Sequence, residues 1–251
     1  MNKRNTSTDI ALERDVRQSA HDLMLAINNY FCREKKDINE IIFVPTMIMC
    51  RIIRTHDAIG LLLENNHPSE ATVLALTQFE LRLDLAYTAS DVKRAGAWLD
   101  HENTKWSLMS VKDKLNTLFS EEAERATLYC IFQYLSGIKH ANPVYSELGF
   151  PGRFKSGEIF VSSGEIADEF SEEFSNKIFA YSSYQLSWSA QVLNVCTATY
   201  AVVDKALRLK VRGLCAKLHP SEEELSNFVK DVVSHRKGAF GMKVWKRKGR
   251  R

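Results

Sequence analysis

Two stretches of the sequence place cations and imidazoles inside segments that are otherwise apolar. The first carries Arg51, Arg54 and His56, and the second carries Lys139 and His140 before an irregular region. Guanidinium and ammonium groups can hold a phosphate, and an imidazole can move a proton near neutral pH. We therefore expect these five residues to line a cleft that binds a phosphate ester.

A third segment supplies carboxylates to the same candidate site. Glu80 and Asp84 follow i, i+4 spacing in an apolar helical pattern. Burying an unpaired charge costs several kcal/mol, so each carboxylate needs a cation or a metal. The simpler interpretation pairs Glu80 with Arg51 or Arg54, and the alternative is a divalent-metal site completed by one of the two histidines. Because no motif such as His-Glu-x-x-His occurs, we predict neither a metal nor another cofactor.

The spacing of Arg and His gives a second indication of phosphate chemistry. An Arg followed a few residues later by a His is typical of metal-independent HEPN ribonucleases, in which Arg holds the phosphate and His helps the RNA 2′-hydroxyl attack it. Four pairs have about this spacing: Arg14 and His21, Arg51 and His56, Arg94 and His101, Arg212 and His219. At most one can be the site, and a lone His on an apolar face is more often a hydrogen-bonded core residue. Capping of a helix end likewise explains Lys139 and His140 without a function.

A longer pattern joins these segments. The run 51–89, with Ala-Thr-Val-Leu-Ala-Leu-Thr-Gln-Phe-Glu at 71–80, is followed by Tyr-Leu-Ser at 134–136 and Lys-His at 139–140. Over about residues 45–210 the chain resembles a family of bacterial helical proteins known only as a domain of unknown function. The resemblance implies a HEPN-like helical fold and, as for some relatives, an association with phage-defence or toxin-like operons. HEPN-like sites are commonly assembled between two copies, so it also implies a homodimer.

The charge of the chain is distributed unevenly. The formal net charge is +3, but residues 208–251 hold thirteen Lys and Arg against four acids. Residues 236–251 contain no acid and include Phe240 and Trp245 among the cations. Because cations bind phosphates and aromatic rings stack on bases, we predict that this tail binds RNA or single-stranded nucleic acid. The predicted contacts are Arg236, Lys237, Lys243, Trp245, Lys246, Arg247, Lys248, Arg250 and Arg251. A solubilising end or a docking strip for an acidic partner is the alternative.

Composition indicates a soluble protein of the cytoplasm. The chain is 45% hydrophobic and 26% charged, which is ordinary for a globular domain. Its five cysteines show no zinc-type spacing, so we expect free thiols in a reducing compartment. Residues 1–9 lack an apolar leader, and no run of about 18 apolar residues occurs, so we expect no membrane association.

Helical periodicity dominates the sequence and predicts an all-α bundle. The expected helices cover about 8–33, 41–64, 68–89, 95–99, 106–119, 121–138, 169–212 and 225–234. Alternation around a Ser-Gly turn predicts a small β-hairpin insertion at about 150–163. The expected organisation is a helical bundle domain over 1–218, followed by a C-terminal helix and basic tail over 219–251.

Two hypotheses of function follow. The first is a HEPN-like helical effector that binds RNA and, if it is an enzyme, cleaves it as a metal-independent endoribonuclease in anti-phage defence or a toxin–antitoxin system. The second is a non-catalytic regulatory or scaffold subunit that docks a partner enzyme encoded nearby. In that case the basic tail binds nucleic acid without any cleavage.

Overall fold

The protein is helical throughout the part of the chain that its structure, a computed structural model, describes: residues 6–34, 39–104, 109–139, 169–199 and 203–218. The helices in these ranges are α1 (Thr6–Glu34), α2 (Glu40–Glu64), α3 (Pro68–Ala89), α4 (Val92–Leu99), α5 (His101–Thr104), α6 (Val111–Leu118), α7 (Glu122–Lys139), α9 (Glu169–Thr199) and α10 (Lys205–Leu218). The all-α prediction is therefore confirmed for the described ranges. The predicted hairpin, the predicted helix at 225–234 and the basic tail lie outside them.

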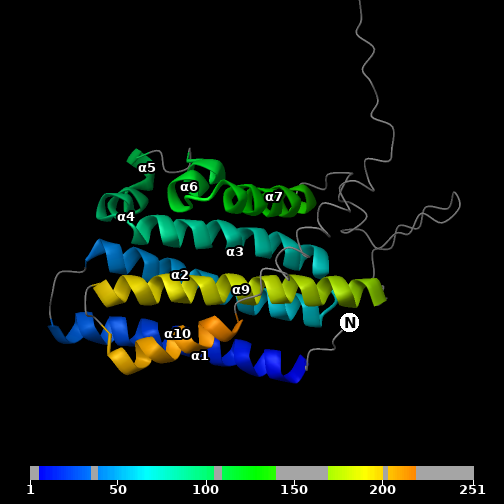
Figure 1. The fold of residues 1–251 in the computed structure, drawn as a ribbon, viewed down its shortest axis with the longest axis horizontal. Coiled ribbons are helices and arrows are strands. Elements are labelled where there is room, and N and C mark those ends of the chain that lie inside the picture. The colour runs from blue at the N-terminus through cyan, green and yellow to red at the C-terminus, as the bar shows by residue number, and fades with distance from the viewer. Residues whose placement is uncertain (1–5, 35–38, 105–108, 140–168, 200–202, 219–251) are drawn as a thin grey trace, which may run out of the picture.

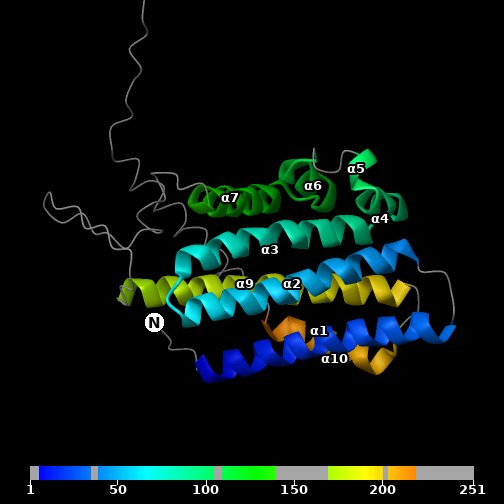
Figure 2. The same cartoon turned by 180° about the vertical axis from the view of Figure 1, so that it is seen from behind.

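The helices stack in layers, as Figures 1 and 2 show from opposite sides. Helices α1 and α10 form one outer layer, and α2 and α9 lie next to them. Helix α3 packs on both α2 and α9, while α4, α6 and α7 cover the other side of α3. Helices α2, α3 and α9 therefore form the centre of the bundle.

A tight turn folds α3 back along α2. Asn39 caps the start of α2 by accepting from the main-chain N–H of Ile41. At the other end Asn66 adopts a left-handed backbone with φ of 59°, a conformation that asparagine tolerates well. Pro68 then occupies the first turn of α3, where its missing N–H removes no helical bond. These local signals make the two helices antiparallel neighbours.

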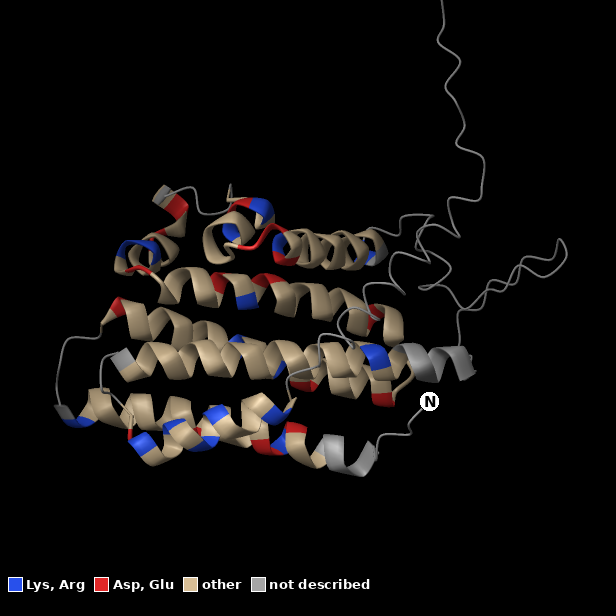
Figure 3. Ribbon diagram, in the orientation of Figure 1, with Lys and Arg blue, Asp and Glu red and all other residues tan. Residues whose placement is uncertain are grey.

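Helix α9 has the composition of a fully surrounded helix. Residues 178–199 contain no charged side chain, and Figure 3 shows this part of α9 without charge bands while α10 carries several cations. Its side chains enter two hydrophobic clusters, one with α1, α2 and α10 and one with α3, α6 and α7. Leu186, Ala190 and Leu193 belong to the first cluster, and Ile178, Tyr181 and Tyr184 belong to the second. Burial of most of its side chains fits the position of α9 between α1 and α10 on one side and α3 on the other.

A cysteine from α9 compensates for the proline inside α2. Pro45 has no N–H, so it cannot donate to the carbonyl of Ile41 four residues earlier. The thiol of Cys196 donates to that carbonyl at 3.2 Å. The buried carbonyl therefore keeps a partner, and α2 continues through Pro45 to Glu64.

The prediction of one helix over 169–212 was wrong, because the structure has two helices there. Helix α9 ends at Thr199 and α10 begins at Lys205. Asp204 caps α10, since its side chain accepts from the N–H of Ala206 at 2.8 Å. The break lets α10 pack on both α9 and α1.

Candidate functional site

The structure places the predicted site residues in different environments. Among the described residues, His56 is buried, Glu80 is partly buried, and Arg51, Arg54 and Lys139 are exposed. His140 and the predicted tail contacts (236, 237, 243, 245–248, 250 and 251) lie outside the described residues. The described members separate into a buried network around His56 and a partly exposed cluster around Glu80.

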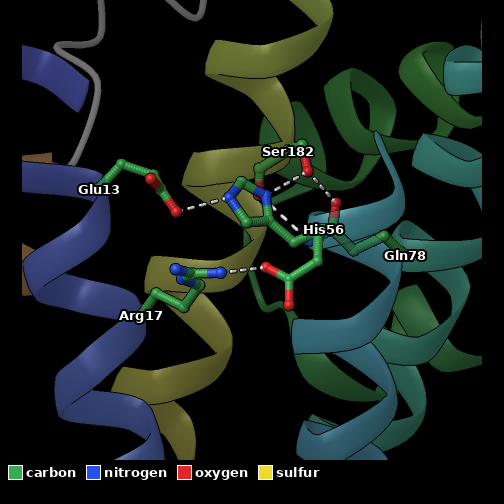
Figure 4. Close-up of polar contacts among 6 residues, drawn as sticks. Glu13, Arg17, His56, Gln78 and Ser182 are labelled. Atoms are coloured by element: carbon green, nitrogen blue, oxygen red, sulfur yellow. Dashed lines mark hydrogen bonds and ion pairs between the residues drawn. The ribbon is translucent and has the colours of Figure 1, made fainter. Parts of the chain in front are cut away.

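His56 is the centre of a polar chain that joins four helices (Figure 4). Its Nε2 lies 2.7 Å from Oε1 of Glu13 on α1, and its Nδ1 lies 2.7 Å from Oγ of Ser182 on α9. The Ser182 hydroxyl donates to Oε1 of Gln78 on α3 at 2.7 Å, and the Gln78 amide donates to the main-chain oxygen of Ser182 at 3.2 Å. Relative exposure is 2% for His56 and 8% for Glu13, so the chain is sealed from solvent.

The hydrogen bonds fix how many protons this network contains. The hydroxyl of Ser182 donates its proton to Gln78, so Nδ1 of His56 must carry a hydrogen and donate it to the Ser182 oxygen. The short contact at Nε2 then needs one more proton, shared between His56 and Glu13. The pair is either an imidazolium with a carboxylate or an imidazole with a carboxylic acid. In both forms each nitrogen of the ring is bonded.

An ion pair lies beside this network, one helical turn along α1. Arg17 contacts Asp57 at 2.6 Å, and both side chains are about two-fifths exposed. The hydrogen bond to Asp57 raises the pKa of Arg17 above its usual value. Exposed pairs of this kind contribute little to stability.

His56 itself is enclosed by the bundle. Its hydrogen bonds help to fix how α1, α2, α3 and α9 pack on one another, and in this arrangement its ring cannot contact a polymer.

The second cluster lies where α3 meets α6 and α7, and we call it the carboxylate–lysine face. It consists of Glu80 and Asp84 from α3, Lys114 from α6, Lys139 from α7 and Arg51 from α2. Lys114 donates to Asp84. Burial raises the pKa of Glu80, while the charges of Lys139 and then Lys114 lower it in part. Burial also raises the pKa of Asp84 against the opposing effects of Lys114 and Arg51.

This face brings together three of the predicted site residues. The charge of Lys139 lowers the pKa of Glu80, and the charge of Arg51 lowers that of the neighbouring Asp84, so charged groups of α2, α3 and α7 meet here. The cations that act on Glu80 are lysines rather than the expected arginines. His56 is not part of this face, because it bonds to α1 and α9. Within the described ranges, no group of three or more His, Cys, Asp or Glu is arranged to hold a metal.

Sequence reasoning missed a buried arginine on the opposite side of α3. Arg82 is 1% exposed and donates to Gln185 of α9 at 2.9 Å. Its guanidinium carbon lies 4.2 Å from the ring centre of Trp188 and 5.3 Å from that of Tyr184. Aromatic faces attract such a cation, which explains how Arg82 is held without a carboxylate partner in the described part of the chain. The available signal was the one Lys or Arg within the apolar sequence of α3.

Comparison with known proteins adds no assignment, since no protein-family model, curated protein or solved structure matches the chain. Of the helices in the described ranges, none combines the length and the apolar character needed to cross a bilayer. The site must therefore be interpreted from its own geometry.

Proposed function

We propose that this protein is a HEPN-like helical effector that binds RNA, with a phosphodiester held at the carboxylate–lysine face. The observation that carries the proposal is the position of Glu80. It is a partly buried acid whose pKa is raised by burial, and the charges of Lys139 and Lys114 act on it. Acids with such perturbed pKa values cluster at functional sites. The predicted basic tail would supply the sequence-independent part of the affinity.

Cleavage is the stronger form of the proposal, and it assigns a role to each group. Glu80 as a carboxylate accepts the proton of the RNA 2′-hydroxyl, and the 2′-oxygen attacks phosphorus. The 5′-oxygen leaves with a proton from water, which gives a 2′,3′-cyclic phosphate. Arg51 and Lys139 stabilise the charge on the phosphate oxygens. A raised pKa suits this role, because the ionised carboxylate is then a stronger base.

The experiment compares matched variants of the full chain with end-labelled single-stranded RNA. We expect Glu80→Gln to abolish cleavage and to retain binding, while Glu70→Gln, at an exposed position of the same helix, changes neither. Lys139→Gln should weaken binding and reduce the salt dependence by about one phosphate contact, and Lys112→Gln on α6 is its control. Labelled RNA that stays intact with and without Mg²⁺ or Mn²⁺ refutes cleavage. Fluorescence anisotropy that shows no RNA binding refutes the proposal as a whole.

The second candidate function is the non-catalytic subunit, and a specific observation favours it. Both polar arrangements make contacts inside the bundle, since His56 is bonded at both nitrogens and Asp84 is paired with Lys114. These groups then specify the fold, and nucleic acid is bound by the tail alone. Deletion of residues 236–251 would abolish RNA binding, while Glu80→Gln and Lys139→Gln would leave it unchanged. A role in anti-phage defence or in a toxin–antitoxin system, and a homodimeric state, belong to the first proposal.

A further inference from the structure

Helices α9 and α10 line a half-open surface pocket of about 320 Å³ that is separate from both polar arrangements. It lies between the C-terminal half of α9 and the middle of α10, on the side of the bundle away from α7. Its volume is at the lower end of the range for small-molecule sites. The pocket is therefore large enough for a ligand of modest size.

Three polar atoms in the wall of this pocket have no hydrogen-bond partner among the described residues. They are Oε1 of Gln191, Oδ1 of Asn194 and Nε of Arg208. Asn194 is 6% exposed, and its amide orientation is fixed because its Nδ2 donates to the main-chain oxygen of Arg208 at 3.1 Å. Its oxygen is thus left as an acceptor. Buried polar atoms are normally bonded, so two acceptors and one donor at one pocket point to a polar ligand.

The charges of the lining residues indicate the charge of that ligand. Arg208 and Arg212 both line the pocket, and none of its lining residues is Asp or Glu. Two guanidinium groups without a carboxylate match a dianion, and arginine binds phosphate oxygens through paired N–H donors.

Apolar side chains complete the wall. Val195 and Leu209 are 58% and 55% exposed, and both line the pocket together with Ala198. A ligand that covers them would remove apolar surface from water. The lining therefore combines a dianion site, two hydrogen-bond acceptors and an apolar side.

We propose that this pocket binds a nucleoside 5′-monophosphate whose base carries an exocyclic amino group. Arg208 and Arg212 hold the phosphate, the amino group donates its two hydrogens to Gln191 and Asn194, and the base lies against Val195 and Leu209. The proposal does not depend on RNA cleavage at the carboxylate–lysine face. The same chemistry occurs at the 5′-phosphorylated end of an RNA strand, so the experiment includes both sources.

Isothermal titration of the full chain with AMP tests this assignment. IMP differs from AMP chiefly in presenting an oxygen where AMP has the amino group, so we expect it to bind roughly tenfold more weakly or worse, because two acceptors then face an acceptor. Adenosine and inorganic phosphate should each bind more weakly than AMP. Displacement of AMP by a 5′-phosphorylated oligoribonucleotide that begins with A assigns the pocket to strand ends, and failure to displace it assigns the pocket to the free nucleotide.

Variants of α10 provide the control for non-specific charge effects. Arg212→Gln, at an exposed position, should weaken AMP binding roughly tenfold. Lys210→Gln removes the same charge two residues away, at a side chain that pairs with Asp22 and does not line the pocket, so it should leave binding unchanged. Circular dichroism confirms that both variants fold. The proposal is overturned if AMP gives no binding at millimolar concentration, if IMP binds as tightly as AMP, or if the two variants lose affinity equally.

Discussion

The shared proton of His56 and Glu13 allows a quantitative test of a buried charge pair. His56→Leu removes the only side chain in the described structure that contacts the Glu13 carboxylate within hydrogen-bond distance. Glu13 is 8% exposed, so its carboxyl group, when ionised, is left in the bundle without a hydrogen-bond partner among the described side chains. Breaking a buried pair in this way costs about 3–5 kcal/mol of unfolding free energy.

Two further variants separate the charge from the hydrogen bonds. Glu13→Gln keeps the shape and lets a neutral His56 accept from the new amide, so it should cost only about 1–2 kcal/mol. The double variant Glu13→Leu, His56→Leu removes both charges, and replacing a buried pair with apolar groups is often nearly neutral. We expect the double variant to be at least about 2 kcal/mol more stable than His56→Leu alone.

The assay is urea unfolding followed by far-ultraviolet circular dichroism, with unfolding free energies obtained by linear extrapolation. The natural protein, His56→Leu, Glu13→Leu and the double variant form a double-mutant cycle whose coupling energy measures the pair directly. A double variant whose loss equals the sum of the single losses would show that the two residues are not coupled. The assignment of the shared proton would then have to be abandoned.

Three other predictions concern ionisation and helix stability. Burial raises the pKa of Glu80 above 4.5, so the favourable contribution of Glu80 to folding is complete below about that pH and is lost as pH rises through the raised value. Glu80→Gln should therefore gain stability relative to the natural protein between acid and neutral pH. A difference in unfolding free energy that stays the same across this pH range in urea titrations would contradict this. Burial raises the pKa of Cys196 to about 11 and also raises that of Cys215, whereas Cys32 is exposed. Iodoacetamide at about pH 8 should thus label Cys32 first, as read by mass spectrometry, and equal labelling would argue against the buried positions. A methyl group added at Gly213 meets no atom within 4 Å, so Gly213→Ala should stabilise α10 by about 0.5–1 kcal/mol in thermal unfolding, and a loss of stability would show that the glycine has another role.

The helices were predictable where the sequence carries local end signals. The bounds of α2 and α3 follow from Asn39 and Pro68, and Ser110 with Asp113 forms a capping box that starts α6 later than periodicity alone suggested. The break between α9 and α10 was missed because residues 169–212 contain neither proline nor glycine, and the apolar pattern continues through it. Asp204 was the one local signal, and a single aspartate in a helical pattern is ambiguous.

The polar contacts depend on tertiary structure, and the sequence predicted them less well. His56 was expected beside Arg51, but its partners are 43 and 126 residues away in the chain. The two nearest aromatic rings of Arg82, Trp188 and Tyr184, likewise come from α9, about a hundred residues later. Glu80 was expected beside Arg51 or Arg54, whereas the cations whose charges act on it are Lys139 and Lys114. Such contacts depend on which helix faces which neighbour, and spacing within one helix does not determine that.

Pro45 and Cys196 depend on each other, so we expect their substitutions to be coupled. Replacing Cys196 with a side chain that has no donor leaves the carbonyl of Ile41 without a hydrogen-bond partner inside the bundle, whereas serine would preserve the contact. Restoring an N–H at position 45 gives that carbonyl a donor within its own helix, and the thiol then becomes dispensable. Homologous chains with another residue at 45 should therefore tolerate alanine at 196, and those that keep the proline should keep cysteine, serine or threonine there.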